Sequence, residues 1–183
     1  MLSYVPMQSL FDPFFPPGRL TYVKSNFVQS LSDEAIETTA AHMGKGPSPY
    51  SFAPGIEHWH GAATRVGVSD TAFPHRQNAF NFMIWSNWEG ADNSAKNIQW
   101  TRDYWSAMKP FLKTGSYGNY VSDEGETVAR EAYGANFDRL VTLKNKYDPT
   151  NLFCMNHNIK PTLQSAASRT KPIDLGATNA AVS

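Results

Sequence analysis

The pattern of apolar and polar positions predicts several strands in the first half of the chain. Residues 20–27 (LTYVKSNF) alternate between the two classes, which is typical of a half-buried strand. Residues 79–88 (AFNFMIWSNW) are rich in aromatic and β-branched side chains, as expected of a central strand. Residues 56–68 contain a strand-like stretch in which Gly61 is expected to allow close backbone approach, and residues 71–76 predict a short strand or turn. The short connections from residue 56 to residue 88 favour an antiparallel sheet over βαβ crossovers.

Apolar positions with helical spacing predict two helices that cover this sheet. Ser32 is a predicted N-cap, followed by two acidic residues that complement the positive end of the helix dipole, and Gly44 supplies the stop. One face of this helix carries Leu31, Ala35, Ile36, Thr39, Ala40 and Met43. A second helix is predicted over residues 96–113, kinked or ended by Pro110. Its apolar stripe consists of Tyr104, Trp105, Met108, Phe111 and Leu112.

Two shorter helices are predicted near the C-terminus. They cover residues 124–133 and 137–147, are separated at Gly134, and end at Asp148-Pro149. The predicted fold class is therefore α+β: an antiparallel sheet covered by helices, with a C-terminal helical pair and a disordered tail.

The two ends of the chain carry little helical or strand signal. Residues 1–18 contain four prolines and predict an extended segment without the basic region of a signal peptide. Residues 162–183 are small and polar and predict the disordered tail. No apolar run reaches the ~18 residues that a membrane span needs. The cytoplasm is the expected compartment.

Composition narrows the functional classes. The 183 residues fit one domain or a compact half of a larger one, and 41% are hydrophobic and 13% aromatic, which suits a folded protein with an aromatic-lined surface. Basic and acidic residues number 16 each, so charge gives no case for a nucleic acid or an anionic membrane as partner. Because Cys154 is the single cysteine, an intrachain disulfide and a cysteine-rich metal site are excluded.

A cluster of polar aromatic residues follows the second predicted helix. Tyr117, Asn119 and Tyr120 place two phenols and a carboxamide within four positions. In an extended segment Tyr117 and Asn119 would lie on one side and Tyr120 on the other, unless a local turn intervenes. Spacing alone also fits a tyrosine-rich strand whose hydroxyls are simply hydrogen-bonded.

This cluster and the run over residues 136–161 (NFDRLVTLKNKYDPTNLFCMNHNIKP) together resemble the C-terminal berberine-bridge-enzyme-like segment of FAD-linked oxidases. The resemblance implies that Tyr120 is the base that deprotonates the substrate and that Tyr117, Asn119 and Trp59 lie on the substrate or flavin side. A phenol with a pKa near ~10 needs help at neutral pH, and a nearby cation or donor is expected. The acidic residue of the motif is Asp123, one position later than the commonest spacing.

The terminal run carries further implied contacts. The resemblance implies that Asn158, and with it Asn156, forms hydrogen bonds beside the flavin; the alternative is that both asparagines cap the last turn. Cys154 and His157 stand where the family usually has Arg and Gln, and Cys154 is not the cysteine that some members bond to the flavin. Trp59 stands beside His60 where related oxidases carry a second tyrosine, which argues against a two-tyrosine mechanism.

The resemblance extends over residues 4–161 and divides the chain. It implies a substrate-binding region over residues 1–115, the berberine-like segment over residues 116–161 and the tail over residues 162–183. The FAD-binding domain is expected to precede Met1, so the isolated chain is not expected to retain FAD. The expected partners are a small-molecule substrate (an alcohol, sugar or amine), a separate flavin-binding chain and further copies of this chain. The alternative is a non-catalytic remnant or binding module.

Two histidine motifs have ordinary explanations. His58 and His60 could chelate a metal, but without a third ligand we interpret them as sheet histidines, and no metal is expected. His75-Arg76 could bind an anion, but hydrogen bonds that stabilise the fold are the preferred interpretation. The chain contains no Walker, dinucleotide-binding glycine or zinc motif, and no nucleophile elbow.

Overall fold

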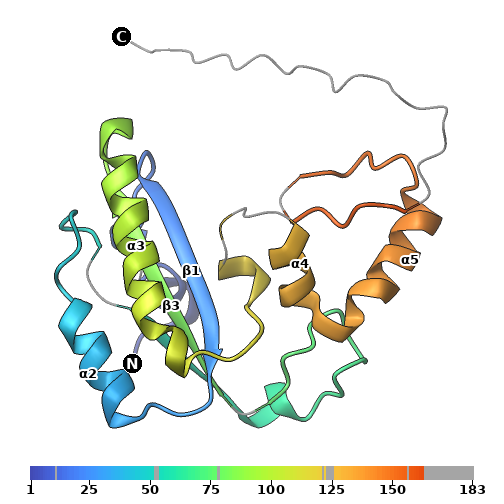
Figure 1. Ribbon diagram of the computed structural model, residues 1–183, viewed down its shortest axis with the longest axis horizontal. Helices are drawn as coiled ribbons and strands as arrows, with labels where there is room; N and C mark the ends of the chain where they lie inside the picture. The colour runs from blue at the N-terminus through green and yellow to red at the C-terminus, as the bar shows by residue number, and fades with distance from the viewer. Residues whose placement is uncertain are drawn as a thin grey trace.

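Three antiparallel strands form the centre of the computed structural model, which describes residues 1–10, 12–51, 54–77, 79–120, 122, 126–155 and 157–162. The sheet order is β1-β3-β2, with β1 (Leu20–Val28), β2 (Gly55–Trp59) and β3 (Ala79–Trp88). The structure confirms the α+β class and the predicted central strand, β3, and β1 lies beside it in Figure 1.

The register of the sheet decides which side chains share a face. Phe27 pairs with Asn81 and Asn81 pairs with Glu57, so these three side chains form one row across the sheet. The alternate positions, such as Phe82 and Ile84, face the helices. There they join a buried core cluster that comprises Val28, Ala35, Phe82, Ile84, Tyr104 and Met108.

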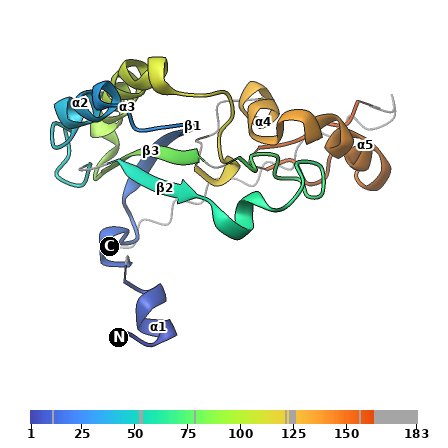
Figure 2. The same ribbon diagram turned by 90° about the horizontal axis from the view of Figure 1, so that it is seen from below.

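Helices α2 (Asp33–His42) and α3 (Ser94–Met108) cover one face of the sheet, and Figure 2 shows them together above the strands. Ser32 caps α2 as predicted, because its Oγ accepts a hydrogen bond from the Ala35 amide at 3.3 Å. The α3 helix is shorter than predicted: it gives way at Met108 to a 3₁₀ turn, Lys109–Phe111, that contains the proline.

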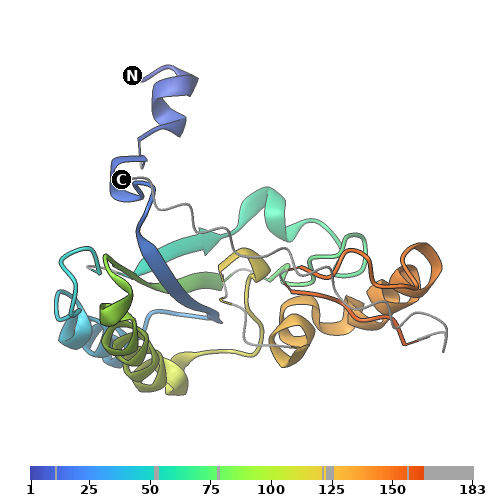
Figure 3. The ribbon, with the colours of Figure 1, turned by 90° about the horizontal axis from the view of Figure 1, so that it is seen from above.

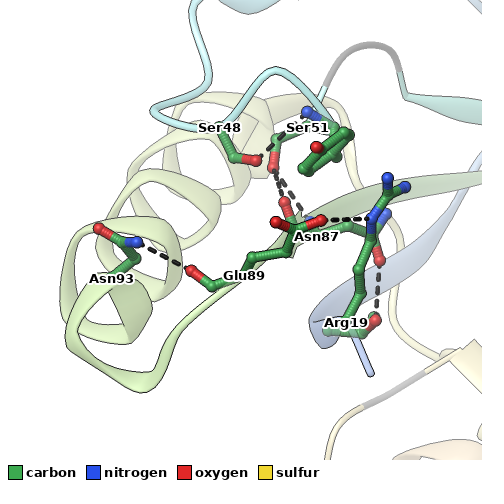
Figure 4. Close-up of polar contacts among 8 residues, drawn as sticks. Arg19, Ser48, Ser51, Asn87, Glu89 and Asn93 are labelled. Carbon is green, nitrogen blue, oxygen red and sulfur yellow. Dashed lines mark hydrogen bonds and ion pairs between the residues drawn. The ribbon is translucent and has the colours of Figure 1, made fainter. Parts of the chain in front are cut away.

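A buried polar network fastens the loop before β2 to the end of β3 (Figure 4). The Oγ atom of Ser51 donates to the Asn87 carbonyl at 3.2 Å and accepts from the Asn87 amide at 3.0 Å. The same Oγ lies 2.9 Å from Ser86 Oγ, which donates to Asn97 on α3. Because these groups are buried, such pairing avoids the cost of unsatisfied polar atoms.

The C-terminal helices α4 (Glu126–Tyr133) and α5 (Phe137–Tyr147) form a second lobe beside the sheet (Figure 1). The carboxylate of Asp148 ends α5: it accepts hydrogen bonds from Lys144 Nζ at 2.5 Å and from the amides of Leu152 and Phe153 at 2.7 and 3.1 Å. The Lys144 ammonium, with these amides, lowers the pKa of Asp148. The predicted helical pair is thus confirmed, and its last turn is fixed by one side chain.

Two local predictions are wrong, and for residues 71–76 the structure agrees with the turn and not with the strand. Residues 1–18 are not simply extended, because α1 (Tyr4–Gln8) and a 3₁₀ turn (Asp12–Phe14) form an arm that projects from the sheet in Figures 2 and 3. Pro6 is tolerated because it lies in the first turn of α1, where its missing amide costs no helix bond. Gly61 begins a 3₁₀ turn at a φ of +64° in open space, so it serves conformation and not close approach. Residues 71–76 bend without joining the sheet.

Two predictions concern the membrane and the tail. Among the described residues, no helix combines the length and apolarity needed to cross a membrane. Of the predicted disordered tail, only Thr162 lies within the described residues.

Candidate active site

A 3₁₀ turn at Gly118–Tyr120 brings the two phenols of the tyrosine cluster together. The ring centroids of Tyr117 and Tyr120 lie 5.1 Å apart, and the Tyr120 amide donates to the Tyr117 carbonyl at 2.8 Å. The extended arrangement is therefore wrong: with three residues per turn, positions i and i+3 share a side. Asn119 is exposed, and its Nδ2 donates to the Tyr117 hydroxyl at 2.8 Å.

Glu57 on β2 is the hydrogen-bond partner of Tyr120. The Tyr120 hydroxyl donates to Glu57 Oε1 at 3.0 Å. The other carboxylate oxygen, Oε2, accepts from Asn81 Nδ2 at 3.2 Å and from Trp59 Nε1 at 3.3 Å. Three donors from three segments of the chain thus hold one half-buried carboxylate against the phenol.

The surroundings of Tyr120 favour its protonated form. Burial, and after it the hydrogen bond and negative charge of Glu57 together with the neighbouring Tyr117, raise the pKa of Tyr120 to about 12. The sequence led us to expect a cation or hydrogen-bond donor beside Tyr120. Among the described residues, the partner of the Tyr120 hydroxyl is instead the carboxylate of Glu57. A carboxylate instead stands ready to accept the phenolic proton.

Half-buried aromatic rings form a wall around this pair. The Trp59 ring lies 4.8 Å from that of Phe73 and 5.2 Å from that of Tyr117, and Trp85 lies 5.8 Å from Tyr120, all between centroids. Such rings offer apolar faces to a ring or a C–H surface of a small molecule, while the phenol and the carboxylate offer a proton path.

His75 packs against Phe73, one of the aromatic rings of this wall. Its ring lies 4.9 Å from the ring of Phe27 and 5.4 Å from that of Phe73, and its Nε2 is 3.1 Å from the Ala132 carbonyl on α4. Burial lowers the pKa of His75, against the effect of the Ala132 and Glu131 carbonyls. His75 and the neighbouring Arg76 serve the fold as predicted: Arg76 donates to the carbonyls of Phe73 and Ala63 and to Thr71 Oγ1.

The terminal run lies with α4 and α5 (Figure 1). Its ends are tied to α5, since Lys144 Nζ donates to the Phe153 carbonyl at 2.7 Å and the Thr162 amide donates to Asn145 Oδ1 at 2.9 Å. Asn158 Oδ1 and His157 Nδ1 are buried and have no hydrogen-bond partner in the described part of the chain. Asn156 and Asp123, both singled out in the sequence, lie outside the described residues.

His58 lies on β2, and His60 follows the end of that strand. The rings of His58 and His60 lie 4.4 Å apart, but the described residues contain no group of three or more side chains able to hold a metal ion. His58 instead stacks on Phe80 at 4.6 Å.

The structure brings four of the predicted site residues together: Trp59, Tyr117, Asn119 and Tyr120. The sequence did not indicate Glu57 or Asn81. A signal was present, because Glu57 and Trp59 alternate on one strand and Asn81 is a carboxamide within the most apolar strand. Pairing them required the register of β2 against β3, which no local pattern sets.

Comparison of the chain with known proteins shows which family it is similar to. The family model "Berberine and berberine like" matches residues 116–160. A berberine bridge enzyme-like protein (C-1) of Nicotiana tabacum is 29% identical over 181 residues, covering 81% of this chain and 31% of the relative. An FAD-linked oxidoreductase of Dictyostelium discoideum is 31% identical over 164 residues, covering 88% and 35%. The chain fits part of a berberine-bridge-enzyme-like FAD-linked oxidoreductase.

A solved structure shares the fold of this chain. Berberine-bridge-enzyme-like protein 28 of Arabidopsis thaliana superimposes with a TM-score of 0.69 at 22% identity, over 80% of this chain and 34% of that structure. The chain spans about a third of the length of the curated relatives it matches. Two thirds of the relatives' length therefore has no counterpart here.

Proposed function

We propose that this chain is the substrate-side part of an FAD-dependent oxidase or dehydrogenase, and that it orients an alcohol, sugar or amine for hydride transfer. The hydrogen bond from Tyr120 to Glu57 Oε1, at 3.0 Å beside an aromatic wall, carries the proposal. Oxidation of such a substrate removes a proton as well as a hydride, and this pair is suited to take the proton.

The residues of the terminal run fit a flavin in part. Asn158 Oδ1 and His157 Nδ1 are buried polar atoms without a partner in the described part of the chain, and they suit the polar edge of a flavin ring. When bound, FAD would supply the hydride acceptor. Its diphosphate would be held by a flavin-binding domain, encoded in the same polypeptide or in a separate chain. We expect the isolated chain to be colourless for this reason.

The proton would move along groups of this chain. Tyr120 Oη accepts the proton of the substrate hydroxyl or amine while its own proton passes along the existing hydrogen bond to Glu57 Oε1. The phenol therefore stays neutral and the carboxylate becomes a carboxylic acid, which balances the charge. A relay of this kind suits a phenol whose pKa is raised to about 12, because a free phenolate is scarce at neutral pH.

Replacement of the phenol by a phenyl ring tests the proposal. In the flavin-containing protein, Tyr120→Phe should slow flavin reduction by substrate about 10²–10⁴-fold, the usual effect of losing a general base, with flavin content unchanged. Asn119→Ala is the control, since this exposed side chain donates a hydrogen bond to the Tyr117 hydroxyl and its loss should disturb positioning only mildly. Rapid-mixing measurement of flavin bleaching gives the rate directly.

A wild-type rate of flavin reduction in Tyr120→Phe would contradict the proposal. If Tyr120→Phe reduces flavin at the wild-type rate and only melts at a lower temperature, its hydroxyl is a packing group whose loss costs about 1 kcal/mol. If the wild-type chain forms no flavin complex with any flavin-binding domain, the non-catalytic remnant is the better description.

A further inference from the structure

Asn81 occupies the centre of the row that crosses the sheet beneath the site. It pairs with Phe27 on one side and with Glu57 on the other, and its side chain is fully buried. Its neighbours along this face of β3 are Met83 and Trp85. A carboxamide in such surroundings must be hydrogen-bonded or it destabilises the fold.

Only one of the two polar atoms of this carboxamide has a hydrogen-bond partner among the described residues. Nδ2 donates to Glu57 Oε2 at 3.2 Å, whereas Oδ1 is buried without a hydrogen-bond partner among the residues that the structure describes. The nitrogen faces Glu57 because a carboxylate can only accept. An unsatisfied buried acceptor is costly, and a leucine of similar size would avoid that cost. The stability of the fold therefore does not explain why position 81 is an asparagine. The hydrogen bond from its Nδ2 atom to Glu57 does explain it.

We infer that Asn81 is a positioning residue that holds the Glu57 carboxylate against the Tyr120 hydroxyl. The inference rests on the proposed function of that pair. Glu57 belongs to an edge strand and is half-buried, so its side chain has room to rotate toward solvent. Asn81 and Trp59 both donate to Oε2, which leaves Oε1 directed at Tyr120. Without Asn81, one weak bond at 3.3 Å would restrain that oxygen.

The ionisation of Tyr120 reports this positioning without any flavin. The pKa of Tyr120 is raised by burial and by Glu57 and Tyr117, which are the ionisable groups that act on it. Tyrosinate absorbance of the full chain, recorded after a rapid jump to alkaline pH, gives the titration curve. Subtracting the curve of Tyr120→Phe isolates the contribution of Tyr120.

Asn81→Leu should lower the Tyr120 midpoint from about 12 toward that of a free phenol, ~10, because the carboxylate turns away. Its melting temperature should equal or exceed that of the wild type, since the unsatisfied acceptor is gone. Asn87→Leu is the matched control: Asn87 is buried on the same face of β3, but accepts from Thr21 Oγ1 and not from the site. The control should melt earlier and leave the midpoint unchanged.

An unchanged Tyr120 midpoint in a folded Asn81→Leu protein would overturn the inference. If the leucine variant fails to fold, Asn81→Ala removes the same donor with less bulk and decides the matter on the same midpoint. Because the titration needs no flavin, an unchanged midpoint in Asn81→Leu would leave the proposed oxidase function standing. Conversely, a wild-type rate of flavin reduction in Tyr120→Phe would overturn the proposed function and leave the midpoint result standing.

Discussion

The imidazole ring of His75 lies so close to Gly115 that a Cβ atom on the glycine would come within 2.2 Å of the ring's Cε1 atom. Gly115 also has a φ of +102°, a backbone conformation that other residues rarely adopt. The Nε2 atom of the same ring lies 3.1 Å from the Ala132 carbonyl oxygen, within hydrogen-bond distance. One side chain therefore joins the sheet lobe, the linker before Tyr117 and α4.

Gly115→Ala should destabilise the chain beyond the cost of backbone strain alone. A positive φ costs about 1–3 kcal/mol for a residue with a Cβ, and here the ring must also move. Gly18→Ala is the matched control, because Gly18 has a φ of +90° with no heavy atom within 4 Å of a built Cβ. Urea unfolding should show a clearly larger loss for Gly115→Ala. Equal losses would mean that the contact with His75 contributes nothing.

Acid should weaken the fold through His75. Burial lowers the pKa of His75 below its ordinary value of 6.5, so the unfolded chain binds the proton more readily than the folded one. The contribution of neutral His75 to the free energy of unfolding is fully present above pH 6.5. It is lost as the pH falls through the lower pKa of the folded state. Unfolding free energies measured at neutral and mildly acidic pH should differ less in His75→Gln than in the wild type. An identical pH dependence in the two proteins would contradict this assignment.

The parts of the fold that the sequence predicted are those with strong local signals. Ser32 followed by an acidic turn fixed the start of α2, and the aromatic run of β3 marked the central strand. The sequence does not predict the helix at residues 4–8, because its prolines favour an extended segment, although the first turn of a helix tolerates proline. The limits of β2 were missed because only its register with β3 distinguishes strand from turn.

The sequence predicted only the part of the site whose residues lie close together in the chain. Tyr117 and Tyr120 are close in the chain, and a turn could unite them. Glu57 and Asn81 come from two other strands, so their contact with Tyr120 depends on tertiary structure. The direction of the effect on Tyr120 also could not be foreseen, because it depends on whether the partner is a donor or a carboxylate.

Exposed apolar side chains predict self-association of the isolated chain. Leu152, Phe153 and Met155 are 75, 77 and 81% exposed at the turn after α5. Contiguous apolar surface of this kind favours association, and a net charge of zero does not oppose it. Sedimentation at micromolar concentration should therefore show dimers or larger species.

The double change Leu152→Ser and Phe153→Ser should shift this equilibrium toward monomer. Both residues bond Asp148 through their backbone amides, so the turn is preserved. Val5→Ser on the exposed arm is the control and should have a smaller effect. A wild-type chain that sediments as a stable monomer would argue against an uncovered interface.

The central claim is that Glu57 takes the proton of Tyr120 as the substrate is oxidised. The pH dependence of flavin reduction by substrate, compared between wild type and Glu57→Gln in the flavin-containing protein, tests it most directly. Glutamine keeps the size of the side chain but cannot take up the proton. We predict that Glu57→Gln is about 10²-fold or more slower at neutral pH and recovers as the pH rises, because an ionised Tyr120 needs no acceptor. Reduction of flavin by Glu57→Gln at the wild-type rate at neutral pH would contradict the account.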